Sequence, residues 1–145
     1  MSAENVELVR SLQPGSEVDL VAFFADDDAA GALSQAAARF FDPGFECTMQ
    51  LPGSPATTYR GLDGFRATWR DWLAPWATYR TEIQDLIDVG DRVVVLARDY
   101  GRRAPGAREV EQRNAAVWTV RDGLIVRAEF YADRGEGVAA VGLAK

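Results

Sequence analysis

Apolar and polar residues follow two different periods along this chain. Between residues 61 and 76, large apolar side chains recur at steps of three and four residues, which places them on one side of an α-helix. Weaker helical patterns cover residues 4–12, 18–25, 29–41 and 135–143. Alternating patterns predict strands over residues 45–51, 79–88, 92–100, 110–120 and 124–132, and Pro, Gly and Ser predict a loop over residues 52–58.

Asp122 and Gly123 separate the last two predicted strands. Asp-Gly between two apolar runs predicts a type I′ hairpin turn, in which both central residues take positive φ. Because helices come first and antiparallel strands follow, the order predicts an α+β fold with helices on one face of a sheet. The alternation within the strands predicts that the opposite face is more polar.

Length and composition fit a single domain spanning residues 1–145. The chain is 48% hydrophobic, but no run approaches the ~18 apolar residues that a membrane helix needs. The first ten residues carry acids where a signal peptide is basic and then apolar, so we expect a cytoplasmic protein. The net charge of −6 disfavours nucleic acid and anionic membranes as partners.

The chain has no histidine and one cysteine, Cys47. This excludes Ser-His-Asp and Cys-His catalysis and nearly every zinc site, so we expect no metal and no cofactor. Cys47 lies in an apolar strand, where an inert buried thiol is expected. The acidic run Asp26–Asp28 lacks the alternating ligand spacing of a calcium loop and instead predicts a helix N-terminus.

Four sequence blocks carry a family likeness. They read DPGFECTMQLP, TYRGLDGFRATWRDWL, LIDVGDRVVVLARDYGRR and AVWTVRDGLIVRAEFYAD, and they lie between Asp42 and Asp133. Together they resemble the SnoaL-like domain family of the nuclear-transport-factor-2-like superfamily. The resemblance implies a cone-shaped, curved antiparallel sheet wrapped around N-terminal and central helices, with a pocket inside. Members include polyketide cyclases, ketosteroid isomerases, limonene epoxide hydrolases and non-catalytic binding proteins, so the fold alone does not choose a function.

Side-chain alternation sorts the residues that face the pocket. On the last strand, Ala128 and Phe130 belong to the apolar set, and a two-residue hairpin places Val117 beside Ala128 on the same inner face. The strand over residues 92–100 is ambiguous, because both of its faces are apolar. Resemblance to the epoxide hydrolases, which carry an inward Arg-x-Asp on this strand, favours Arg98 and Tyr100 as the inward residues.

The same comparison shows departures from the known chemistries. Tyr100 and Phe130 stand where the epoxide hydrolases carry carboxylates, while Thr48 and Gln50 replace the Tyr and Asn that position their water. Ketosteroid isomerases need an inward Asp on the first strand, and this chain has none there. A polyketide cyclase needs an acid-base Asp in the pocket. Asp99 or Asp133 could serve only if the face assignment is wrong by one residue.

We therefore expect a pocket that holds a small hydrophobic molecule, with cofactor-free isomerase, cyclase or hydrolase chemistry. A non-catalytic ligand-binding or dimerisation module is the alternative. The candidate catalytic residues are Arg98, Tyr100 and Asp99. The candidate substrate-binding residues are Thr48, Gln50, Phe65, Trp69, Trp72, Trp76, Val117, Ala128 and Phe130.

A homodimer is the expected assembly. The face assignment leaves Trp118, Ile125 and Tyr131 on the outer face of the sheet, among charged residues. Exposed aromatic residues on a sheet face suit an interface, and the superfamily resemblance also implies pairing through the sheet.

Overall fold

The structure is a computed structural model that describes residues 2–51, 53 and 55–143. Its helices are α1 (Ser2–Ser11), α2 (Leu20–Ala25), α3 (Asp27–Ala37), the 3₁₀ turn η1 (Ala38–Phe40), α4 (Gly61–Leu73) and α5 (Arg134–Ala140). Its strands are β1 (Phe41–Gln50), β2 (Thr57–Arg60), β3 (Thr78–Val89), β4 (Arg92–Arg102), β5 (Val110–Arg121) and β6 (Leu124–Tyr131).

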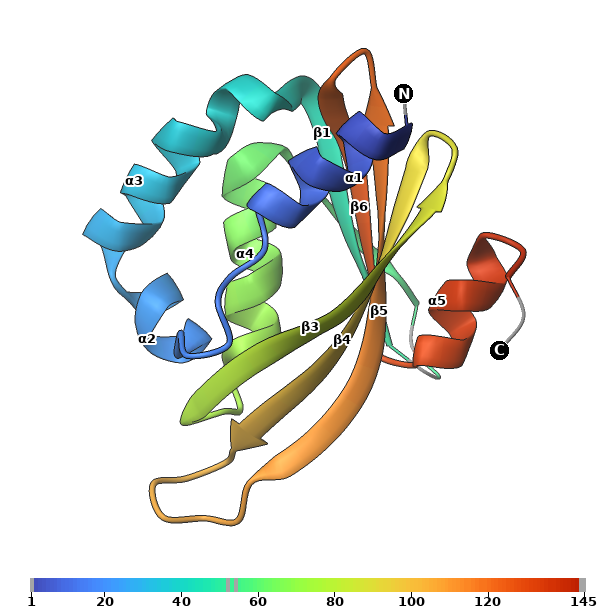
Figure 1. Ribbon diagram of the computed structural model, residues 1–145. Helices are drawn as coiled ribbons and strands as arrows, with labels where there is room; N and C mark the ends of the chain where they lie inside the picture. Colours follow the sequence, from blue (N-terminus) through green and yellow to red (C-terminus); the bar gives the residue numbers. More distant parts are fainter. Residues whose placement is uncertain (1, 52, 54, 144–145) are drawn as a thin grey trace.

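The six strands form one curved, unclosed sheet in the order β2-β1-β6-β5-β4-β3. Helices α1 to α4 lie on one side of this sheet and α5 lies on the other (Figure 1). The predicted α+β fold is confirmed. Two details differ from the prediction: β1 pairs with β6 in parallel, and β2 is a strand where residues 57 and 58 were expected in a loop.

Carboxylates begin two of the short helices, and the sequence predicts the one at Asp26. Asp26 caps α3 by accepting hydrogen bonds from the backbone N–H groups of Asp28 and Ala29. Asp19 caps α2, and the same oxygen also accepts from the backbone N–H of Tyr79. Asp19 therefore ties the helical layer to the first residues of β3.

The inner core lies between α1, α4 and the concave face of the sheet. Its fully buried side chains include Val9, Phe45, Cys47, Val93 and Ile125. A second apolar cluster forms under α5 on the convex face, where Val94, Ala115 and Val117 pack against Val138. Both faces of the central strands are therefore covered. No helix among the described residues is long and apolar enough to cross a membrane.

The β5–β6 hairpin has the predicted turn, with φ values of 52° at Asp122 and 76° at Gly123. A bulge next to the turn changes its register. Val120 pairs with Ile125, but Thr119 pairs with Arg127, so Val126 is an extra residue on β6. Beyond the bulge, Ala128 faces Trp118 instead of Val117.

Because of this bulge, the predicted face assignment of β5 is wrong by one residue, and the aromatic patch expected on the outer face of the sheet is not there. Trp118 and Ile125 are buried in the inner core, at 3% and 0% exposure. Val117 lies on the convex face under α5. The face proposed for dimerisation therefore lacks two of the three apolar residues that suggested it.

Candidate functional site

An internal cavity of about 300 Å³ lies between the concave face of the sheet, α4 and the N-terminal segment. Residues 11–14 and the α2 side chains Phe23 and Phe24 contribute to its walls. The strands contribute Met49 from β1, Ile83 from β3 and Val95 from β4. A volume of this size is about ten times that of a water molecule in the liquid, and lies at the lower end of small-molecule sites.

Aromatic rings from α4 and the sheet form the largest part of the apolar wall. The ring centroid of Phe130 lies 5.2 Å from that of Trp69 and 6.1 Å from that of Phe65. Trp118 lies 5.8 Å from Phe130, in an edge-on arrangement. Trp69 also stacks on Phe24 at 6.0 Å. Stacked, tilted and edge-to-face contacts together hold these rings in place around the cavity.

Among the described residues that line the cavity, Asp99 is the one with an acidic or basic side chain of the Asp, Glu, Lys or Arg type, and it is 2% exposed. Its Oδ1 accepts a hydrogen bond of 2.5 Å from the Thr81 hydroxyl. Its Oδ2 accepts two more, each of 2.5 Å, from the Tyr79 hydroxyl and from Nδ2 of Asn114. Thr81 faces Asp99 directly across the β3–β4 pair, while Asn114 lies on the neighbouring strand β5.

Burial is the largest effect on the pKa of Asp99 and raises it above the ordinary value of 3.8. The three hydrogen bonds and the more distant Arg134 lower it, but the net direction is upward. Burial and the neighbouring Asp99 raise the pKa of Tyr79, so the phenol keeps its proton and donates a hydrogen bond to the carboxylate. The group is therefore a buried carboxyl with increased basicity, held by uncharged donors.

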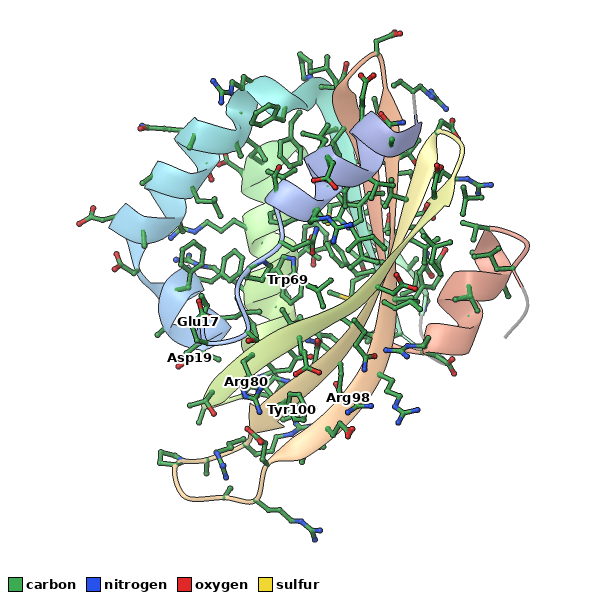
Figure 2. All side chains as sticks on the ribbon, in the orientation of Figure 1. Glu17, Asp19, Trp69, Arg80, Arg98 and Tyr100 are labelled. Carbon is green, nitrogen blue, oxygen red and sulfur yellow. The ribbon has the colours of Figure 1, made fainter. Side chains whose placement is uncertain are left out.

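Arg98 and Tyr100 lie on the opposite face of β4 from the cavity, so the predicted face assignment of this strand is wrong by one residue. Arg98 Nε lies 3.2 Å from Glu111 Oε1, and the Arg80 guanidinium stacks 4.1 Å from the centroid of the Tyr100 ring. Figure 2 shows Arg98 on the α5 side of the sheet, whereas Trp69 lies between α4 and the strands. Arg98 cannot reach a ligand in the cavity.

Of the other predicted site residues, some line the cavity and some lie away from it. Phe65, Trp69, Trp72 and Phe130 line the cavity. Trp76 is buried beside it, with its ring 5.2 Å from that of Tyr79. Residues on the convex face or in the core away from the cavity wall are Thr48, Gln50, Val117 and Ala128.

Sequence reasoning missed Tyr79, Thr81 and Asn114, which bind Asp99. One signal was present in the sequence. Val93, Val95, Ala97 and Asp99 lie on the same face of the predicted strand, and one acid at the end of an otherwise apolar face is unusual. The signal was ambiguous because α5 covers the convex face, which makes Val94 and Leu96 on that face apolar as well. Register across the bulges then decided which side chains meet.

Cys47 is fully buried in the inner core, and burial raises the pKa of its thiol to about 12. Within the described residues, no three His, Cys, Asp or Glu side chains come close enough to share a metal ion.

A curved, open sheet that encloses an aromatic cavity with one buried carboxyl group defines a class of small α+β pocket proteins. Within this class, the chain belongs to the SnoaL-like domain family, whose model matches residues 18–128. This confirms the family resemblance drawn from the sequence. No curated protein matches the chain significantly.

Solved structures share the fold at low sequence identity. A candidate SnoaL-like polyketide cyclase from Jannaschia sp. CCS1 has a TM-score of 0.64 and 19% identity, over 89% of this chain and 85% of its own. An NTF2-like protein of unknown function from Burkholderia pseudomallei K96243 has a TM-score of 0.62 and 20% identity, over 96% and 98%. TerC, co-crystallised with polyporic acid, has a TM-score of 0.61 and 18% identity, over 88% and 89%.

Proposed function

We propose that this protein binds a small hydrophobic molecule in the cavity and that Asp99 acts on it as a general base, in cofactor-free isomerase or cyclase chemistry. The observation that carries the proposal is the position of Asp99. It is a buried carboxyl group at the wall of an otherwise apolar and aromatic cavity. The likeness to a candidate polyketide cyclase and to TerC, which was co-crystallised with an organic compound, supports this choice.

The environment of Asp99 suits proton transfer. A general base works best when its pKa is close to the working pH, and burial moves the pKa of Asp99 in that direction. Tyr79, Thr81 and Asn114 fix the carboxylate from the sheet side. Phe65, Trp69 and Phe130 line the same cavity as Asp99, so a substrate packed against these rings is held in the same cavity as the carboxylate.

A test of the base requires no knowledge of the natural substrate. The probe is 2-tetralone, an apolar ketone with acidic hydrogens beside its carbonyl, and the assay is NMR measurement of deuterium uptake in D₂O. We expect the protein to accelerate uptake above the buffer rate. Asp99→Asn should lower that acceleration by about 10²–10⁴-fold, the usual contribution of a general base.

Arg98→Ala is the matched comparison, because Arg98 occupies the next position on the same strand but lies on the other face. It should leave the exchange rate unchanged. If Arg98→Ala removed the activity and Asp99→Asn did not, the base would be assigned to the wrong face. If the protein bound 2-tetralone without accelerating exchange, the non-catalytic binding function would replace the enzymatic one. A cytoplasmic location belongs to the same proposal, and cell fractionation would test it.

A further inference from the structure

Arg134 reaches from α5 to the backbone of the central strands. At the start of this helix, Asp133 accepts a hydrogen bond from the backbone N–H of Glu136, which places Arg134 in the first turn on the convex side of the sheet (Figure 1). The helix lies close to β5 because Gly137 has no side chain, and a Cβ atom there would lie 2.7 Å from Cβ of Ala115. This close approach brings the Arg134 guanidinium onto the strands themselves.

Three acceptors on three neighbouring strands hold the Arg134 guanidinium. Its Nη2 donates to the backbone oxygen of Ala97 on β4 at 2.7 Å and to Oε1 of Gln84 on β3 at 2.6 Å. Its Nε donates to the backbone oxygen of Asn114 on β5 at 3.3 Å. Ala97 and Asn114 are cross-strand partners, and Nδ2 of Asn114 donates to Asp99. Arg134 therefore holds, from the opposite face of the sheet, a residue that binds the candidate base.

The positive charge of Arg134 is not balanced on its own face of the sheet. Among the described residues, no carboxylate forms an ion pair with it. Burial, Arg113 and Arg98 lower the pKa of Arg134, whereas the carboxylate of Asp99 raises it. In the other direction, the charge of Arg134 lowers the pKa of Asp99. The two groups therefore attract each other through the sheet.

The other titratable groups around Asp99 do not supply this charge. Tyr79 and Tyr131, which lie near the carboxyl group or on the same cavity wall, are neutral phenols with raised pKa values. The convex face of the strands and α5 carry further charges of both signs, which are Arg80, Glu82, Arg98, Glu111, Arg113, Arg127, Glu129 and Glu136. Several of them compensate one another, as Arg98 and Glu111 do at 3.2 Å.

We propose that Arg134 is a positioning residue for the candidate base: from the convex face it fixes Asn114 beside Asp99, and its charge stabilises the ionised carboxylate. This inference rests on the proposed function, since it concerns the same carboxyl group. A general base must be ionised to accept a proton, and burial in an apolar cavity disfavours that form. Arg134 does not line the cavity, so it supplies a compensating charge without taking space from a ligand.

The expected effect is a change in the titration of Asp99. Charges on opposite faces of one sheet lie on the order of 10 Å apart, and an effective dielectric of about 20 then changes an ionisation equilibrium by roughly tenfold. Water reaches part of the guanidinium and weakens the attraction. Loss of Arg134 should therefore move the Asp99 midpoint to a roughly three- to tenfold lower proton concentration, that is, to higher pH.

Carbon-13 NMR titration of the aspartate carboxyl carbons measures this midpoint, and Asp99→Asn identifies the signal by its loss. Arg134→Gln should raise the midpoint, and Arg134→Lys, which keeps the charge, should return it toward the wild-type value. Arg113→Gln is the matched control, because it removes an arginine from the same face beside Asn114 in sequence. It should move the midpoint less than Arg134→Gln does. An unchanged midpoint in folded Arg134→Gln, or an equal shift in both variants, would overturn the inference.

A second measurement uses wild-type Arg134 and covers the case in which Arg134→Gln does not fold. Coupling between two sites is reciprocal, so the ionisation of Asp99 must affect Arg134 as strongly as Arg134 affects Asp99. The Nε–H signal of Arg134 should therefore change with pH at the Asp99 midpoint, and this change should be missing in Asp99→Asn. A signal that stays constant through the Asp99 transition would contradict the proposed coupling.

The pH profile of deuterium exchange into 2-tetralone connects the coupling to activity. In Arg134→Gln the rate should fall at pH values below the midpoint and return to the wild-type plateau at high pH, whereas a purely structural defect would lower it at every pH. If the wild-type protein does not accelerate exchange, the proposed function fails, and the two NMR titrations still decide the coupling. If exchange is accelerated and Arg134→Gln leaves its pH profile unchanged, the inference fails and the proposed function stands.

Discussion

Gly101 on β4 is the position where a single methyl group should disturb both stability and the site. A Cβ atom built there would lie 2.5 Å from Cζ3 of Trp76, well inside the ~3.5–4.0 Å of an ordinary carbon contact. The Trp76 ring has little room to move. It is 7% exposed, lies 5.2 Å from the Tyr79 ring and is covered by the Arg103 guanidinium at 4.2 Å.

The cost of Gly101→Ala follows from this geometry. Overpacking of a confined site costs about 1–3 kcal/mol, and the rigid ring places this case in the upper half of that range. Replacing a strand glycine returns about 0.5–1 kcal/mol of backbone entropy. The free energy of unfolding should therefore fall by about 1–2 kcal/mol. Displacement of Trp76 should also reach Asp99, because Tyr79 contacts both.

Gly31→Ala on α3 is the matched control, since the same methyl group there meets nothing within 4 Å. It should raise the free energy of unfolding by about 0.5–1 kcal/mol through helix propensity. Urea titrations followed by tryptophan fluorescence measure both variants, with the slope m checked for constancy. If Gly101→Ala is as stable as the wild-type protein, the close contact between Trp76 and the β4 backbone does not exist in solution.

Three further predictions concern titration, reactivity and assembly. Because burial raises the folded-state pKa of Asp99 above 3.8, its stabilising contribution is complete below that pH and is lost as the pH rises through the folded value. The free energy of unfolding of the wild-type protein minus that of Asp99→Asn should therefore be larger at pH 4 than at pH 7. Chemical denaturation measures this difference, and a difference that increases from pH 4 to pH 7 would contradict the prediction. Cys47, fully buried and with its pKa raised to about 12, should react with Ellman's reagent only at the rate of unfolding. Self-association through the sheet remains a prediction, and a monomer in sedimentation velocity at micromolar concentration would refute it.

Local sequence patterns were sufficient for most of the elements and their order; the short strand β2 is the exception. The helix spacing over residues 61–76 identified α4, and Asp122-Gly123 identified the β5–β6 turn. These features depend on interactions within a few residues, namely helix periodicity and the positive φ of a type I′ turn. The sequence blocks also led to the correct family, because they cover the strands and the helix that build the cavity.

The site itself required the long-range arrangement of the chain. Asp99 and Arg98 are neighbours in sequence, so they lie on opposite faces of β4. The local pattern does not show which of them faces the cavity, because α5 covers the convex face and Val94 and Leu96 on that face are apolar too. The extra residue Val126 then shifts the hairpin register by one, which brings Trp118 to the inner face in place of Val117. Since side chains alternate with a period of two, each shift of one residue reverses inside and outside. The partners of Asp99 come from β3 and β5, and only the pairing of these strands with β4 brings them together.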